Sequence, residues 1–228
     1  MPTSSTTNFL PDFTEIAEEA WERAGREMRA GYDLRTARRS MNLLTLEWQN
    51  RGINMWTIDS GSVSLTSGTA TYNLPTDTVD LLEHVVRTND GNTTSQSDLV
   101  INRISMPDYA SIPNKLATGR PISILINRLR TTPTFTLWPV PDGSTTYTLY
   151  YWRTRRIEDA GDGVETADMP TRFYPALVAG LAYYLAMKTP TLADRVQMLK
   201  QDYDEQFALA AAEDREKSTT RIVPRLSM

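Results

Sequence analysis

Residues 172–188, RFYPALVAGLAYYLAMK, constrain the fold most, because their pattern predicts a helix with almost no polar side. The interior of the stretch carries no charged residue. On a helical wheel the large side chains form one broad stripe, and small residues fill the remaining positions. The large residues are Phe173, Leu177, Leu181, Tyr184 and Leu185, and the small ones are Ala176, Ala179, Gly180, Ala182 and Ala186. We therefore expect other elements to surround this helix.

The length of this apolar stretch separates a core helix from a membrane anchor. Arg172 and Lys188 bracket about fifteen residues, whereas a helix needs roughly twenty apolar residues to cross a bilayer. Small residues also let a neighbouring backbone approach closely. The stretch therefore predicts a buried core helix, with no membrane anchor.

Composition excludes several classes of function. The chain of 228 residues has a net charge of −4, which argues against a dedicated nucleic-acid binder but not against a protein that surrounds DNA. It has no cysteine, so disulfides, thiolate metal sites and cysteine nucleophiles are excluded. Its first residues, MPTSSTTNFLPDF, show no basic segment followed by an apolar run. We expect no secretion signal and synthesis in a cytoplasm.

Two helices are predicted before the chain changes character. Asp12 and Glu15 have the spacing of a capping box, and the helix that follows should end near Gly31. The second helix should begin with Asp33 as its N-cap and end at Gly52. Its apolar residues alternate spacings of three and four: Leu34, Ala37, Met41, Leu44 and Trp48. We expect this stripe to pack against the 172–188 helix inside one bundle, in preference to a separate zipper.

After residue 52 the apolar period changes from helical to alternating, which predicts a sheet. Strands are expected within 53–74 and at 80–88, 97–104, 122–129, 134–138 and 146–153, with a short helical turn at 107–112. The run of strands at 122–129, 134–138 and 146–153, the last two joined through 139–143, predicts a β-meander. Aromatic residues alternate onto both faces of the last strand. Part of this sheet should therefore be covered on both sides or meet another subunit.

The chain then returns to helical periodicity. Residues 157–170 are acidic and contain glycine, which indicates a loop before the 172–188 helix. A last helix is predicted within 192–216, with one stripe formed by Leu192, Val196, Leu199, Tyr203, Phe207 and Ala210. The final segment, KSTTRIVPRLSM, has three basic residues, no acidic residue and no helical period. It is predicted to be an extended arm.

Together these patterns predict an α+β fold with an antiparallel four-helix bundle formed by the N- and C-terminal helices. A long antiparallel β-sheet or sandwich is inserted between them. The expected domains are a helical bundle of residues 12–52 and 171–216, an inserted β domain of residues 53–170, and a C-terminal arm of residues 217–228. Neither half of the bundle can bury its apolar face alone, so the two ends of the chain should pack together.

The chemical motifs of enzymes are missing from the sequence. His84 is the one histidine and lies in the apolar run LLEHVVR, where we expect a satisfied structural side chain. No Gly-x-Ser-x-Gly turn and no glycine-rich phosphate loop is present. The pairs Asp159/Asp162 and Glu213/Asp214 are interpreted as solvated charge. We therefore predict no catalytic, cofactor-binding or metal-binding residues, no cofactor, and a protein that is not an enzyme.

One tight basic group follows the last predicted strand. Arg153, Arg155 and Arg156 follow Tyr151 and Trp152, and the ring of either residue could stack on a base in a nucleic-acid site. A solvated strand end or a salt-bridged subunit contact is the favoured interpretation. Trp152 and the three arginines are therefore candidates for a subunit or tail contact.

Several motifs in order resemble one known family. They are WQNRGINMW at 48–56, YNLPTD at 72–77, GRP at 119–121, LWPVPD at 137–142, the run from Tyr174 through GLA at 180–182 to AEDR at 212–215, and RIVP at 221–224. Together they resemble the adaptor, or tail tubular protein A, of short-tailed bacteriophages. The similarity covers residues 48–225 but departs from the family pattern between 88 and 114.

The resemblance implies a structural virion protein, made in the host cytoplasm and located at the tail and portal vertex. Such adaptors form a homo-oligomeric ring, usually of twelve subunits, docked under the portal protein and joined to the tail nozzle protein and tail fibres. DNA passes through the lumen without sequence-specific binding. The arm is then expected to contact the portal or a neighbour through Lys217, Arg221, Ile222, Val223, Pro224 and Arg225.

Two other classes stay open at this stage. Aromatic strands around Trp138 and Trp152 suggest a carbohydrate- or cell-surface-binding β module on a helical stalk. A hydrolase that uses the carboxylate pairs is the weakest alternative.

Overall fold

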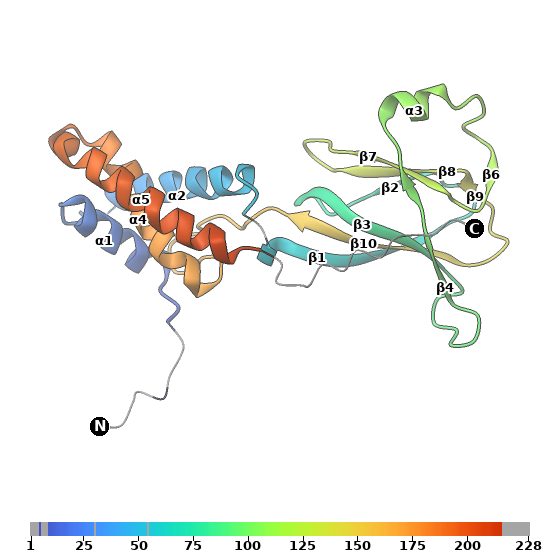
Figure 1. Cartoon of the computed structure of the whole chain (residues 1–228), viewed down its shortest axis with the longest axis horizontal. Helices are drawn as coiled ribbons and strands as arrows, with labels where there is room; N and C mark the ends of the chain where they lie inside the picture. Colours follow the sequence, from blue (N-terminus) through green and yellow to red (C-terminus); the bar gives the residue numbers. More distant parts are fainter. Residues whose placement is uncertain (1–4, 6–8, 30, 54, 216–228) are drawn as a thin grey trace, which may run out of the picture. The chain divides into compact units, whose positions relative to one another are not determined.

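The computed structural model describes residues 5, 9–29, 31–53 and 55–215. The chain divides into two compact units, a helical unit of Met1–Trp56 with Ile157–Met228 and a β unit of Thr57–Arg156 (Figure 1). The predicted α+β class is confirmed, because helices from both ends of the chain form one unit and the strands form the other.

Four long helices share the core of the helical unit: α1 (Phe13–Ala24), α2 (Tyr32–Asn50), α4 (Tyr174–Lys188) and α5 (Val196–Glu213). Short 3-10 helices precede α4 and α5, namely η2 (Thr171–Phe173) and η3 (Pro190–Arg195), and η1 (Met55–Thr57) follows α2. Helix α4 packs against each of the other three helices. Their arrangement as an antiparallel bundle stays a prediction.

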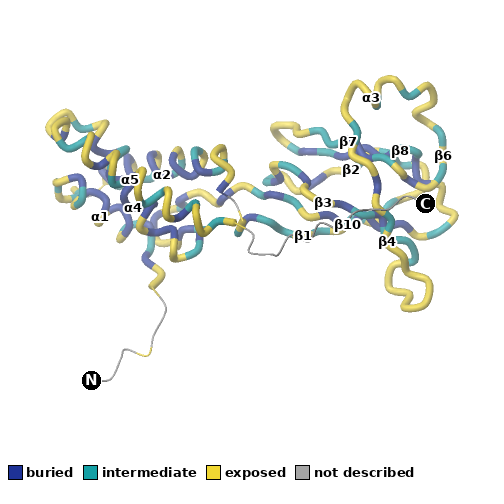
Figure 2. Tube along the Cα trace, viewed as in Figure 1, coloured by how far each residue is buried: buried dark blue, intermediate teal, exposed yellow. Residues whose placement is uncertain are grey.

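Helix α4 is buried along almost its whole length, as its sequence predicts (Figure 2). Gly180 marks its closest approach to its neighbours. A Cβ atom at this position would lie 2.8 Å from the Tyr203 ring and 2.9 Å from the Leu44 side chain. The absence of a side chain at Gly180 is thus what allows α2 and α5 to pack so closely against α4.

The predicted capping box at the start of α1 is confirmed. The Asp12 carboxylate accepts the Glu15 N–H at 2.8 Å, and the Glu15 carboxylate accepts the Asp12 N–H at 3.1 Å. The helix ends at Ala24, earlier than the predicted end near Gly31. Gly25 terminates it in the left-handed conformation, with φ of 98°, and its N–H donates to the carbonyls of the last turn.

Helix α2 begins one residue before the predicted N-cap, so the prediction for Asp33 was wrong. The Asp33 carboxylate is buried and accepts hydrogen bonds from the Arg26 guanidinium at 3.0 Å and the Arg29 N–H at 2.9 Å. It therefore closes the connection between α1 and α2 and caps neither helix.

The β unit contains two four-stranded sheets. One sheet has the order β1 (Ile58–Leu65), β10 (Tyr147–Arg155), β3 (Thr78–Thr88), β4 (Ser97–Val100). The other has the order β2 (Thr71–Asn73), β8 (Thr134–Trp138), β7 (Ser123–Asn127), β5 (Asn102–Arg103). A third ladder joins β6 (Thr118–Gly119) to β9 (Val140–Pro141), and α3 (Met106–Ser111) follows β5. The β5–β7 and β6–β9 pairs are parallel, and the other pairs are antiparallel.

Side chains from both four-stranded sheets form one core, which makes this unit a sandwich. Val86 and Leu149 come from one sheet, and Phe135 and Leu137 from the other. The predicted meander is correct for β7 and β8, which pair antiparallel, and wrong for β10, which lies in the other sheet. The segment between β8 and β10 pairs with β6 through β9, and β10 then enters between β1 and β3.

Residues 157–169 belong to the helical unit, although the sequence pattern grouped them with the strands. The Phe13 N–H donates to the Glu165 carbonyl at 3.0 Å, and Ala160 and Met169 join the helical core. These contacts place the boundary between the units after Arg156 and not at residue 170. A loop can therefore add alanine and methionine side chains to a helical core although its sequence has no helical periodicity.

Candidate interaction surfaces

The isolated histidine lies in the β core and not in a catalytic cleft. His84 is 9 % exposed on β3, and neither ring nitrogen has a hydrogen-bond partner among the described residues. Burial lowers the pKa of His84. The backbone of Ile101 opposes this shift, although it lies outside hydrogen-bonding geometry. The expectation of a satisfied structural histidine is therefore half right: the residue is structural but unsatisfied.

The candidate carboxylate pairs act in the local structure of the helical unit. The Asp159 carboxylate accepts the Gly161 N–H, and the Asp162 carboxylate lies 3.8 Å from the Arg38 guanidinium. The Asp214 carboxylate accepts the Met55 N–H at 3.3 Å. Within the described ranges, no cluster of three or more histidine, aspartate or glutamate side chains could hold a metal ion.

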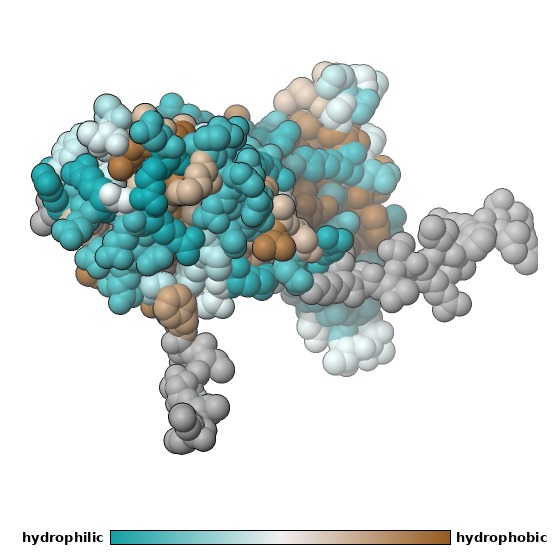
Figure 3. All heavy atoms as spheres, turned by 60° about the vertical axis from the view of Figure 1, so that its left-hand side comes forward, coloured by the Kyte–Doolittle hydropathy of each residue, from teal (hydrophilic) through white to brown (hydrophobic). Residues whose placement is uncertain are grey.

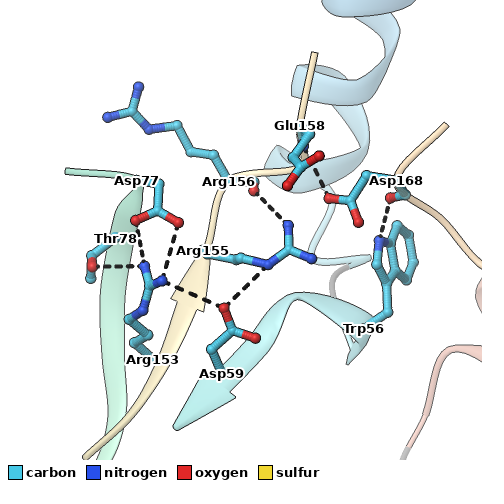
Figure 4. A network of polar contacts seen from close by, with 9 residues as sticks. All are labelled: Trp56, Asp59, Asp77, Thr78, Arg153, Arg155, Arg156, Glu158 and Asp168. Atoms are coloured by element: carbon cyan, nitrogen blue, oxygen red, sulfur yellow. Dashed lines mark hydrogen bonds and ion pairs between the residues drawn. The ribbon is translucent and has the colours of Figure 1, made fainter. Parts of the chain in front are cut away.

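Arg153 is fixed inside the β unit at the end of β10 (Figure 4). Its guanidinium makes a two-pronged contact with the Asp77 carboxylate, at 2.7 and 3.1 Å, and donates to the Thr78 hydroxyl at 3.0 Å. It also lies 3.5 Å from Asp59. The side chain is 11 % exposed, and its hydrogen bonds hold the pKa of Asp77 below its usual value. Arg153 thus ties together β1, β10 and the start of β3.

The other two arginines of the group differ in their surroundings. Arg155 lies 3.3 Å from the Asp59 carboxylate and donates to the Arg156 carbonyl at 3.1 Å (Figure 4). The Arg156 guanidinium donates to the Thr76 carbonyl, and Trp152 is 43 % exposed. Two of the three positive charges are therefore neutralised by Asp59 and Asp77, which removes them from any phosphate site. A subunit or tail contact through this group stays a prediction.

A second set of polar contacts organises the end of the 157–170 segment within the helical unit. The Trp56 indole donates to the Asp168 carbonyl at 2.8 Å, and the Asp168 carboxylate accepts the Glu158 N–H at 3.1 Å (Figure 4). The Trp56 ring also packs on Phe173 with 4.7 Å between ring centres. These contacts fix the segment that leads into α4.

The aromatic residues that suggested a sugar-binding module do not form one platform. Trp138 lies in β8 of one sheet, and its indole donates to the Asn114 carbonyl at 3.0 Å. Trp152 lies in β10 of the other sheet. A sugar platform needs rings on a shared face, so this arrangement does not favour the carbohydrate-binding alternative.

The face of the helical unit that Figure 3 shows is mostly hydrophilic, with separate apolar spots. Between α1 and α4 lies an open groove of about 450 Å³, lined by Phe9, Ile16, Tyr174 and Val178 among others. Burial raises the pKa of Tyr174, whose hydroxyl has no hydrogen-bond partner in the described structure. Exposed side chains on α2 and α5 form two further surfaces, which periodicity did not predict.

The predicted arm contacts Lys217, Arg221, Ile222, Val223, Pro224 and Arg225 lie outside the described residues. Of the residues that the structure does describe, none forms a helix both long and apolar enough to cross a membrane.

Comparison with known families shows to which family this chain belongs. Residues 11–225 match the family described as SU10 adaptor protein. The chain belongs to the SU10 adaptor protein family. No curated protein matches it.

Membership agrees with the resemblance to the head-to-tail adaptors of short-tailed phages and extends it to the first two helices. The chain is a phage adaptor, a structural class of virion protein whose partners are the portal and the tail. Its location is accordingly the portal and tail region of the virion.

Proposed function

We propose that this chain forms a closed ring that joins the portal to the tail nozzle and tail fibres and surrounds the DNA exit channel. The observation that carries the proposal is the family match over residues 11–225. The division into two units, each with its own core, supports it, because an adaptor must bind two different neighbours.

Within this proposal the domains have separate tasks. The bundle of residues 12–52 and 171–216 builds the ring wall, and the inserted β domain, residues 53–170 in the prediction and Thr57–Arg156 in the structure, faces the tail. Trp152 and Arg156 are exposed at the end of β10 and are available for a subunit or tail contact. The arm of residues 217–228 adds to the portal or to a neighbour on assembly.

The ring has twelve subunits in this proposal and acts without enzymatic chemistry or a cofactor. DNA passes through the lumen without sequence-specific contacts. A net charge of −4 supports this role, because a channel that lets DNA slide should not attract phosphates strongly.

Electron microscopy of the full-length chain mixed with its purified portal tests the proposal. Closed rings stacked on the portal are expected. A chain that stays monomeric in the presence of portal would contradict it.

Deletion of residues 217–228 tests the arm separately. The shortened chain should keep the circular dichroism spectrum of the parent and bind portal more weakly, which a pull-down at several salt concentrations would measure. Equal binding by both chains would show that the arm is not a contact.

A further inference from the structure

The groove between α1 and α4 holds a large apolar side chain that lies mostly in solvent. The Phe9 ring meets the Tyr174 ring edge-on, with 6.3 Å between ring centres, and Phe9 is nevertheless 69 % exposed. Ile16 and Val178 line the same groove, whose volume is about 450 Å³. An exposed phenylalanine held at an open, largely apolar groove is typical of a surface that another segment covers.

The α1 side of this groove is acidic. Helix α1 carries four glutamates and one arginine, and Glu15 and Glu19 line the groove. The arginine, Arg23, lies 3.1 Å from Glu19 and 3.6 Å from Asp202, so two carboxylates already share its charge. In the described part of the chain, Glu15 makes no ion pair. The groove therefore suits a segment that is both apolar and basic.

The predicted C-terminal arm has this combination of properties. It carries three basic residues and no acidic residue. Alternate side chains of an extended chain point to opposite sides. In an extended arm, one side therefore carries Ile222, Pro224 and Leu226, and the other carries Arg221 and Arg225. The first side matches the apolar lining of the groove, and the second matches the glutamates of α1.

The described chain ends close to the start of α4, which is also one end of the groove. The Asp214 carboxylate accepts the Met55 N–H at 3.3 Å, and the next residue, Trp56, packs its ring on Phe173 with 4.7 Å between ring centres. Tyr174 follows Phe173 and lines the groove. The arm therefore begins beside the first turn of α4.

The arm is long enough to reach the groove of its own chain. Residues 216–220 span roughly 16 Å when extended, and residues 221–226 span about 20 Å more. Helix α1 rises only about 12 Å between Glu15 and Arg23, which both line the groove. The first five residues can therefore pass the start of α4, and the next six can run along the groove.

We propose that the groove between α1 and α4 binds residues 221–226 of the same chain before the chain meets the portal. The apolar side of the arm packs on Phe9 and Val178, and its two arginines face Glu15 and Glu19. The tether gives the arm an effective concentration in the millimolar range, which favours the arm of the same chain over that of another copy. On assembly the arm leaves the groove for the portal or a neighbour.

Other segments and other hollows fit less well. Residues 1–8 also lie near the groove in sequence, but they have no charged side chain to match the glutamates. A hollow of about 530 Å³ beside α2 is lined by Arg26, Arg39 and Lys188, with Asp33 as its one carboxylate. That hollow would repel a basic segment.

Disulfide trapping in the full-length chain tests the contact, because the chain has no cysteine of its own. Pro175 is exposed and lines the groove. Pro175→Cys is combined in turn with Ile222→Cys, Pro224→Cys and Leu226→Cys, and each variant is oxidised mildly at low concentration without portal. At least one pair should close within the chain, since a disulfide needs Cα atoms within roughly 7 Å. Mass spectrometry would follow the loss of free thiols.

A matched pair controls for random collision of the arm. Leu209 is exposed on α5, only a few residues before the arm begins. An arm that is not bound would reach it as easily as it reaches Pro175. The fastest of the three groove pairs should therefore close about tenfold faster than the same arm cysteine combined with Leu209→Cys. Equal rates would overturn the proposal.

Two further results would assign the groove to another occupant. Disulfide-linked dimers in place of closure within one chain would overturn the proposal in favour of arms exchanged between copies. Closure of Ser5→Cys/Pro175→Cys, with none of the three arm pairs closing, would overturn it in favour of the N-terminal segment.

Charge reversal gives a second readout in the same chain. Arg225→Glu, added to the fastest groove pair, should slow closure about threefold or more, because it places a carboxylate beside the glutamates of α1. Lys217→Glu makes the same change of charge outside the bound segment and should have little effect. Equal slowing by both variants would overturn the proposed contact, because it indicates a general attraction to an acidic surface. These measurements need no portal, so their failure leaves the ring of the proposed function standing.

The converse also holds for the proposed function. A chain that closes its groove disulfide but forms no ring on portal would contradict the ring and leave this contact in place.

Discussion

The two units of this adaptor hold their shapes in different ways. The helical unit depends on close packing around α4, where Gly180 leaves room for Tyr203 and Leu44. The β unit adds ion pairs along its strands, with Arg153 on Asp77 and Arg87 on Asp98 at 2.7 Å each. The stability of the helical unit should therefore depend mainly on side-chain volume, and that of the β unit also on pH and salt.

Replacing Gly180 with a larger residue should reduce stability more than any of the other substitutions below. Gly180→Leu forces a side chain into the Tyr203 ring and the Leu44 side chain, so we expect the helical unit to lose about 3 kcal/mol of stability through overpacking. Urea denaturation followed by circular dichroism would measure the loss. Even Gly180→Ala should destabilise, although alanine normally stabilises a helix interior relative to glycine.

Gly119 in the β unit provides the matched control. A Cβ atom there would lie 3.6 Å from Pro139, which is ordinary van der Waals contact. Gly119→Ala should therefore change stability by less than about 0.5 kcal/mol. A Gly180→Leu chain as stable as the parent would show that α4 is not closely packed.

Removing Arg153 should destabilise the β unit by about 1–2 kcal/mol, because Arg153→Ala leaves Asp77 without its charged donor and leaves Asp59 with Arg155 alone. The expected loss of stability is no larger because both carboxylates are more than two-fifths exposed and therefore partly solvated. Chemical denaturation at neutral pH would measure it. No loss would mean that solvent replaces the arginine at no cost.

The same contact predicts a dependence on acid pH. The folded pKa of Asp77 lies below its unfolded value of about 4. Its stabilising contribution is therefore present above about pH 4 and lost as pH falls through the lower folded pKa. Denaturation curves at pH 5 and pH 3 should diverge more for the parent than for Asp77→Asn. Equal divergence in both would exclude Asp77 as a source of acid sensitivity.

Removing the hydroxyl group should change stability differently at two buried tyrosines of the helical unit. The Tyr203 hydroxyl accepts the Trp48 indole N–H at 3.0 Å, so Tyr203→Phe leaves that donor unpaired and should cost about 1–2 kcal/mol. The Tyr174 hydroxyl has no partner in the described structure, so Tyr174→Phe should be neutral or stabilising. Thermal melts of both variants would compare them. Equal losses would mean that ring packing alone decides stability at these positions.

The smallest effect expected is that of the unsatisfied histidine in the β unit. The pKa of His84 is lowered by burial, so the unfolded chain takes up a proton at about pH 6.5 while the folded chain does not. Stability should therefore fall as pH decreases below about 6.5. His84→Leu should abolish this slope, as urea midpoints between pH 7 and pH 5 would measure. A slope that persists in the variant would place its origin elsewhere.

Local chemistry predicted much of the helical unit. The uniform apolar character of 172–188 indicated its burial, and the spacing of Asp12 and Glu15 indicated the start of α1. Asp33 shows where local chemistry was insufficient. An aspartate before a helical stripe usually caps it, but a buried ion pair with Arg26 determined its position here.

Sheet topology and the exposed helix faces could not be predicted in the same way. Strand β10 pairs with β1 and β3, far away in the chain, and alternation of apolar residues does not specify a partner. Periodicity locates the buried stripe of α2 through Met41 and Leu44 but treats the opposite face as solvent. The apolar side chains that stay exposed on α2 and α5, such as Leu43 and Leu209, became visible only in the structure.

Mass photometry of portal titrated with this chain tests the central claim, that copies of the chain bind one another to form a ring on the portal. If neighbours bind one another, bound copies recruit further copies, and two main species should appear: bare portal and portal with its full ring. A graded series of partly filled portals from the parent chain would contradict the account.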